Sequence, residues 1–69
     1  MQQIALRVRQ LRQDQGLSVR ALAEKAGISA SALSQIESGQ ASPSVATLEK
    51  ICRALRLPIT ALFDAPDGG

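Results

Sequence analysis

The chain has 69 residues, which is enough for one domain and leaves burial only a thin margin over the loss of conformational entropy. Hydrophobic residues make up 45% of the chain and aromatic residues 1%, so a core of aliphatic side chains around the single ring of Phe63 is expected, and packed helices are favoured over a β-sandwich or barrel. The eight Lys and Arg exceed the six Asp and Glu by a formal net charge of +2, which permits a polyanionic partner but does not require one.

The first expected helix starts near Ile4 and ends before Gly16. Ile4, Val8 and Leu11 recur at helical spacing with polar residues between them, which is the pattern of an amphipathic helix. Most of the basic residues precede the middle of the chain: Arg7, Arg9, Arg12, Arg20 and Lys25. For any one of them, a solvated helical face is as good an explanation as contact with a polyanionic partner.

Two short helices are expected next, each bounded by residues that start and stop helices. Ser18 is placed to cap the first, which ends at Gly27. Ser29 is placed to cap the second, which ends at Ser38 and Gly39. Two helices that cross through so short a turn need a small residue where their backbones approach and a glycine where the chain reverses its hand. Ala23 and Gly27 are the residues expected at these places. The second helix is expected to be anchored to the core by Ile28, Leu33 and Ile36.

A fourth helix and a short fifth helix follow a loop over residues 40–43. Ser44 is placed to cap the fourth, whose apolar positions form one stripe: Val45, Leu48, Ile51, Cys52 and Leu55. Pro58 is expected in the first turn of the fifth helix, which carries Ile59, Leu62 and Phe63. The domain is therefore expected to span residues 1–64, and residues 65–69 to form a flexible tail or the start of a linker.

Several short motifs, in this order and spacing, resemble the lambda-repressor and Cro-like (XRE-type) helix-turn-helix family. They are Leu11-Arg12, Gly16-Leu17-Ser18, Leu22-Ala23, Ala26-Gly27-Ile28-Ser29, Leu33-Ser34-Gln35-Ile36-Glu37-Ser38-Gly39 and Pro43-Ser44-Val45-Ala46-Thr47-Leu48. The likeness extends from about Ile4 to Phe63. It implies an all-α, compact five-helix domain in which helices two and three form the helix-turn-helix, and a DNA-binding transcriptional regulator that acts as a repressor.

The resemblance implies that the third helix enters the major groove of double-stranded DNA. Its exposed side chains would then face base edges: Ala30, Ser31, Ser34 and Gln35. Gln35 is the best base reader of the four, because its amide can donate to and accept from adenine, whereas serine is permissive and Ala30 offers only a methyl contact. The alternative for Gln35 is a plain exposed helix residue.

Phosphate contacts are expected on either side of this helix, since helix N-termini and exposed loops offer hydrogen-bond donors. The candidates are Ser18, Val19, Arg20, Ser29, Ser38, Gly39, Gln40 and Ser42. Family members often carry Gln where Val19 stands, so the chain departs from the pattern there, and Arg20 is a possible substitute. The resemblance also implies a partly buried ion pair between Arg12 and Glu37, with an exposed pair of little value as the alternative.

A single domain of this size makes few base contacts, so a homodimer that reads two half-sites of a palindromic operator is expected. The expected dimer contact is formed by Arg56, Leu57, Pro58 and Ile59, together with the exposed side near Phe63. Neither a membrane span nor a signal peptide is evident, so a cytoplasmic location is expected.

Other chemistry finds little support in the sequence. The chain has no histidine, which excludes Ser-His and Cys-His catalysis, and its carboxylates are dispersed rather than paired. Cys52 is the single cysteine and is expected in the core, with no metal site, no cofactor and no intrachain disulfide. The alternative to a DNA-binding regulator is a protein-interaction module of the same fold, antitoxin-like or adaptor-like.

Overall fold

Four α-helices and one 3₁₀ turn make up the fold in the computed structural model, which describes residues 2–63. The helices are α1 (Gln2–Asp14), α2 (Val19–Ala26), α3 (Ala30–Glu37) and α4 (Val45–Leu55), and the 3₁₀ turn is η1 (Ile59–Leu62). No strand occurs within these described residues. The all-helical architecture expected from the sequence is therefore confirmed, while the expected tail over residues 65–69 lies outside the described part of the chain.

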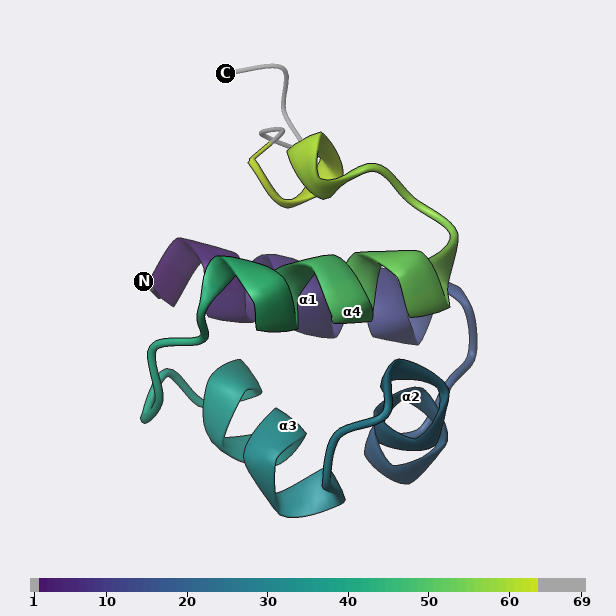
Figure 1. Ribbon diagram of the computed structural model, residues 1–69, viewed down its shortest axis with the longest axis horizontal. Helices are drawn as coiled ribbons and strands as arrows, with labels where there is room; N and C mark the ends of the chain where they lie inside the picture. Colours follow the sequence, from purple (N-terminus) through teal and green to yellow (C-terminus); the bar gives the residue numbers. More distant parts are fainter. Residues whose placement is uncertain (1, 64–69) are drawn as a thin grey trace.

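The elements pack around one core to which all of them contribute. α2 packs against α3 and α4, α1 against α3, and η1 against α4 and α1. In Figure 1, α2 and α3 lie on one side of α4 and η1 lies on the other. The most deeply buried large side chains come from all four helices: Val8, Leu22, Leu33, Ile51 and Leu55. Because α3 reaches the core from one side only, its opposite face is left toward solvent.

Serine caps fix the start of three helices, as the sequence predicted. The hydroxyl oxygen of Ser18 accepts a hydrogen bond from the backbone N–H of Ala21 at 3.0 Å, and that of Ser29 accepts from Ala32 at 3.0 Å. Ser44 does the same with Thr47 at 3.1 Å. Each cap satisfies one of the backbone donors that a helix leaves open in its first turn.

Gly27 ends α2 in the left-handed region, with φ at 75°. The backbone N–H of Ile28 donates to the carbonyl oxygen of Ala23 at 3.0 Å, which is the long hydrogen bond of a Schellman motif. A Cβ added to Gly27 would meet nothing within 4 Å, so backbone conformation and not space requires glycine here. Ala23, the small residue expected where the helices approach, is 2% exposed and lies in the core.

Arg56 ends α4 in the same conformation without being a glycine. Its φ is 60°, and the N–H of Leu57 donates to the carbonyl oxygen of Cys52 at 2.9 Å. A side chain with a Cβ is strained in this region by about 1–2 kcal/mol. Pro58 two residues later indicates that the helix ends before it, but nothing in the sequence indicates that Arg56 takes the left-handed conformation.

Replacing Arg56 with Gly is expected to raise the free energy of unfolding by about 0.5–1 kcal/mol. The gain comes from relief of the left-handed strain and is partly offset by the greater freedom of glycine in the unfolded chain. Urea denaturation followed by helical circular dichroism measures the change. Arg56→Ala is the matched control, because it removes the same charge but keeps the Cβ; equal stability of the two variants would contradict the explanation.

The fifth element differs from the expected α-helix. It is a 3₁₀ turn in which the N–H of Ala61 donates to the carbonyl oxygen of Pro58 at 2.9 Å, and Pro58 is its extended N-cap rather than part of its first turn. Four residues are too few to sustain an α-helix without support, and 3₁₀ geometry is common in such short pieces. The expectation that Phe63 belongs to the helix and the core is wrong: it follows η1 and is 63% exposed.

Two side chains, one from α1 and one from the residue that follows it, bond to distant backbone atoms. The Arg7 Nε donates to the carbonyl oxygen of Ala61 at 2.9 Å, which fastens η1 to α1. The Gln15 Nε2 donates to the carbonyl oxygen of Leu55 at 2.8 Å, which satisfies the C-terminal end of α4. Neither bond could be predicted from the sequence, since both acceptors are backbone atoms far along the chain. Among the helices of residues 2–63, none has the length and apolar character needed to cross a membrane.

Candidate nucleic-acid interface

The helix-turn-helix formed by α2 and α3 is held rigidly to the rest of the domain. Leu33 and Ile36 place the inner side of α3 in the core, with Leu33 fully buried, and Ile28 in the turn is half-buried against it. This is the anchoring that the sequence predicted for these three residues. A helix fixed in this way presents its outer face with little freedom to move, which suits a surface that recognises a partner by shape.

The outer face of α3 is polar and small. Ser31, Ser34 and Gln35 are exposed, as expected for side chains that are to meet a partner. Ala30 differs, because it is half-buried and packs against the core, so only part of its methyl group faces solvent. Ala30 is the first residue of α3, directly after the cap Ser29, where the chain is still close to the core.

Gln35 has a firmly held backbone and an unengaged side chain. Its carbonyl oxygen accepts hydrogen bonds from the N–H of Gln40 at 2.9 Å, the N–H of Ala41 at 3.2 Å and the Ser38 hydroxyl at 3.1 Å. Within the described residues, its side-chain amide makes no hydrogen bond. Both the donor and the acceptor of that amide are therefore available to an adenine edge.

The N-termini of α2 and α3 carry four of the candidate phosphate contacts. Ser18 and Ser29 use their hydroxyl oxygens as cap acceptors, which leaves each O–H free to donate to a phosphate. Arg20 is exposed at the second position of α2. Val19 is half-buried against the core, so its side chain is committed to packing and only its backbone could serve a phosphate.

The loop between α3 and α4 offers fewer donors than the sequence suggested. The N–H groups of Ser38, Gly39 and Gln40 donate to carbonyl oxygens of α3 at 3.0, 3.1 and 2.9 Å, and the Ser38 hydroxyl is also used internally. The backbone N–H groups of these three residues are therefore engaged in the C-terminal motif of α3, so any donor to a phosphate at these positions has to come from a side chain. The exposed Gln40 amide and the exposed Ser42 hydroxyl are side-chain donors of this loop that make no hydrogen bond within the described residues.

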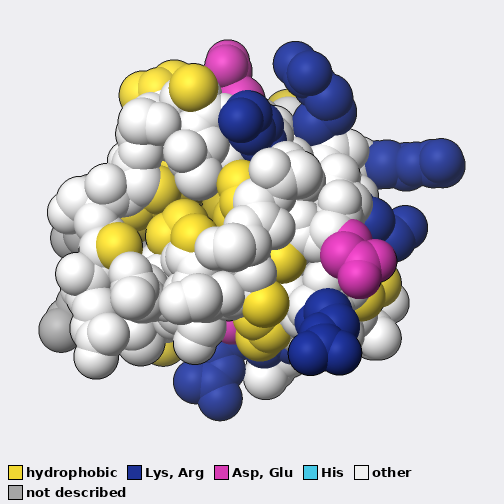
Figure 2. Space-filling view, turned by 60° about the horizontal axis from the view of Figure 1, so that its bottom comes forward, with side chains coloured by type: hydrophobic (Ala, Val, Ile, Leu, Met, Phe, Trp, Pro, Cys, Tyr) yellow, Lys and Arg dark blue, Asp and Glu magenta, His cyan; other side chains and the backbone are white. Residues whose placement is uncertain are grey.

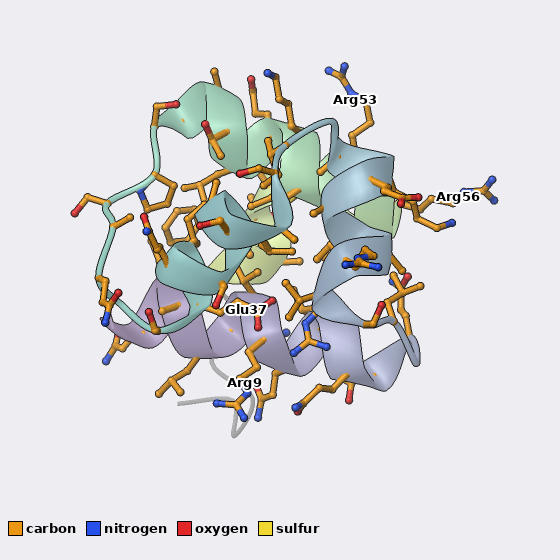
Figure 3. The ribbon with its side chains drawn as sticks, turned by 90° about the horizontal axis from the view of Figure 1, so that it is seen from below. Arg9, Glu37, Arg53 and Arg56 are labelled. Atoms are coloured by element: carbon orange, nitrogen blue, oxygen red, sulfur yellow. The ribbon has the colours of Figure 1, made fainter. Side chains whose placement is uncertain are left out.

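Arg12 and Glu37 form a bidentate, buried ion pair. The Arg12 Nε lies 2.8 Å from Oε2 of Glu37, and the Arg12 Nη2 lies 3.0 Å from Oε1. The two side chains are 11% and 7% exposed. The Arg12 Nη1 also donates to the carbonyl oxygen of Leu17 at 2.6 Å. The guanidinium thereby connects α1, the α1–α2 loop and the end of α3, and Figure 3 shows Glu37 between α3 and α1.

The residues expected at a dimer contact lie on the connection from α4 to η1 and at the first position of η1, and they are unequally exposed. Arg56 and Pro58 face solvent, while Leu57 and Ile59 are half-buried against the core. Phe63 follows η1 and is 63% exposed.

Cys52 lies on the buried side of α4, in the core of the domain, and is 2% exposed. Burial raises the pKa of its thiol above the ordinary value of 9.0, which lowers its thiolate content and its reactivity. Among residues 2–63, no cluster of three or more His, Cys, Asp or Glu comes together that could hold a metal ion.

Comparison with known proteins gives a family match over most of the chain. Residues 8–62 match the model of a helix-turn-helix family, HTH_3. The chain is 41% identical over 63 residues to the HTH-type transcriptional regulator SutR of Escherichia coli strain K12, a match that covers 91% of this chain and 35% of SutR. The chain thus spans about a third of the length of that relative.

Solved structures of similar sequence share the fold. The restriction-modification controller protein C.AhdI from Aeromonas hydrophila is 32% identical with a TM-score of 0.88, covering 90% of this chain and 94% of that one. The N-terminal DNA-binding domain of SinR from Bacillus subtilis is 37% identical with a TM-score of 0.86, covering 96% and 97%. SinR in complex with DNA is 42% identical with a TM-score of 0.81, covering 88% and 98%.

Proposed function

The chain belongs to the XRE-type helix-turn-helix family, and on that premise we propose that it binds double-stranded DNA in a sequence-specific manner and regulates transcription. The observation that carries the proposal is the outer face of α3, where Gln35 presents an unengaged amide from a backbone fixed by three hydrogen bonds. The DNA complex of SinR, a relative of the same fold, supports the same partner for this chain.

In the proposed mode of binding, α3 enters the major groove. The Gln35 Nε2 donates to N7 of adenine while its Oε1 accepts from the N6 amino group, and the two bonds together recognise adenine. Ser31 and Ser34 make permissive contacts beside it, and the partly exposed methyl group of Ala30 can contact a thymine methyl group. The hydroxyls of Ser18 and Ser29 and the side chains of Arg20, Gln40 and Ser42 position the domain on the phosphates.

The proposal extends to a homodimer that occupies a palindromic operator in the cytoplasm and represses transcription by occupying it. Two half-sites about 34 Å apart would place both copies of α3 on one side of the duplex. The contact between the copies is assigned to Arg56, Leu57, Pro58 and Ile59, with the exposed Phe63 beside them.

Gln35→Ala is expected to relax base preference at one position of each half-site by about 1–3 kcal/mol per contact, because a bidentate contact to adenine is lost. Selection from a pool of random duplexes identifies the preferred site, and titration of that site and its single-base variants measures the preference. Gln13→Ala is the matched control, since it makes the same change at an exposed position of α1.

Unchanged base preference in Gln35→Ala would remove Gln35 from the proposed contact. A folded protein that selects no duplex, at a concentration sufficient for dimers, would favour the second candidate function. That candidate is a protein-interaction module, and the observation in its favour is that the outer face of α3 is neutral and lined by small side chains.

A further inference from the structure

α3 and the loop that follows it, which would meet the base edges and adjoining phosphates, carry no cationic side chain. From Ser29 to Ser44, all within the described residues, the single charged residue is Glu37, and its carboxylate is buried against Arg12. Figure 2 shows this face as largely uncharged, with Lys and Arg side chains along its margins. A protein with a basic groove would instead concentrate positive charge where the duplex lies.

The cations of the domain lie elsewhere or are already engaged. Arg9, Arg53 and Arg56 point outward from the periphery in the view onto α3 (Figure 3). The guanidinium groups of Arg7 and Arg12 are bonded within the domain. The exposed cations of the helix-turn-helix itself are those of α2: Arg20 and Lys25.

We propose, on the basis of the proposed DNA-binding function, that this site holds the DNA backbone mainly through neutral donors and therefore binds its operator with unusually weak dependence on salt. The Gln40 amide, the Ser42 hydroxyl and the capping serines donate hydrogen bonds to phosphate oxygens without releasing condensed counterions. Since non-specific binding is driven almost entirely by counterion release, random duplex DNA is bound poorly by the same surface.

The two modes differ enough to be measured. Each cationic contact to a phosphate contributes about −0.9 to the slope of log affinity against log salt concentration. Two such contacts, from Arg20 and Lys25, would lower the affinity of one protomer for its half-site about tenfold between 50 and 200 mM salt, whereas six contacts would lower it about a thousandfold.

The experiment is a salt titration of binding to the selected operator and to a random duplex, with the stoichiometry of the complex determined so that the slope is expressed per protomer. A slope shallower than that of three cationic contacts, about −2.7 per protomer, is the expected result. A steeper slope would overturn the proposal.

Two variants, each of which raises the net charge by one unit, test the location. Ser42→Lys places a cation on the α3–α4 loop and is expected to steepen the slope by about 0.9 per protomer, with tighter binding at low salt. Glu49→Gln makes the same change of charge on α4 and should leave the slope as it is. An unchanged slope in Ser42→Lys would mean that the loop does not meet phosphate, and would also overturn the proposal.

Failure of the inference is distinguishable from failure of the proposed function. Sequence-selective binding with a steep slope would leave the function standing and remove the neutral mode of contact. Absence of binding to every duplex at low salt, with the fold intact, would remove the function and the inference together.

Discussion

Glu37→Gln is expected to lower the free energy of unfolding by about 3–5 kcal/mol, because it removes one partner of a buried pair and leaves the Arg12 charge uncompensated. Both side chains are nearly inaccessible, and the two parallel hydrogen bonds of 2.8 and 3.0 Å are lost or weakened. A domain of this length has about 3–10 kcal/mol in total, so the variant is expected to be close to unfolding at room temperature. Urea denaturation monitored by circular dichroism measures the loss.

The double variant Arg12→Met/Glu37→Leu separates the burial of an unpaired charge from the net value of the pair. Apolar residues of similar volume often replace a buried ion pair without loss, so the double variant should recover most of the stability that Glu37→Gln loses. The Leu17 carbonyl still loses its Arg12 donor, which accounts for about 1 kcal/mol. A double variant no more stable than Glu37→Gln would contradict this explanation.

Leu33→Ala is expected to lower the free energy of unfolding by about 2–5 kcal/mol, the second large effect. The side chain is fully buried where α3 meets the core, so its removal exchanges packed contacts for a cavity. Since this approaches the whole stability of so small a domain, a large unfolded fraction is expected even without denaturant. The helical circular dichroism signal at increasing temperature measures it.

Leu6→Ala is the matched control for this prediction. Leu6 lies on α1 and is 61% exposed, so the same truncation there should change the free energy of unfolding by no more than about 0.5 kcal/mol. A loss below about 1 kcal/mol in Leu33→Ala would mean that α3 can collapse onto the core without this residue, and would argue against a rigid outer face.

The two variants also separate stability from recognition. Glu37 and Leu33 both hold the inner side of α3, and neither reaches the outer face on which Gln35 lies. Their effects on DNA binding should therefore follow the folded fraction. Gln35→Ala, by contrast, should leave stability almost unchanged and alter base preference.

Local rules were sufficient for the starts and most of the ends of the helices. A serine cap needs a hydroxyl three residues before a backbone N–H, and Ser18, Ser29 and Ser44 fill that place in the structure. A glycine such as Gly27 ends a helix because it alone enters the left-handed region without strain. These are interactions between neighbours in the chain, so the sequence contains the whole of their cause.

The contacts that depend on distant partners were decided by the tertiary structure. Arg56 takes the left-handed conformation, which its residue type disfavours, and the Leu55 carbonyl at the end of α4 accepts from Gln15, which follows α1. The 3₁₀ turn at residues 59–62 is fastened to α1 by Arg7, and Phe63, which follows it, lies outside the core. The acceptors of these hydrogen bonds are backbone carbonyl groups, which every residue has, so no sequence pattern predicts which of them will be used.

The candidate site divides in the same way. The sequence by itself determined which helix is presented and which polar residues its outer face carries, because helical spacing separates Leu33 and Ile36 from Ser31, Ser34 and Gln35. Only the tertiary structure decided which candidate side chains remain available: Val19 and Ala30 are half-buried against the core. Periodicity fixes the direction of a side chain, whereas its exposure depends on every group that folding brings against it.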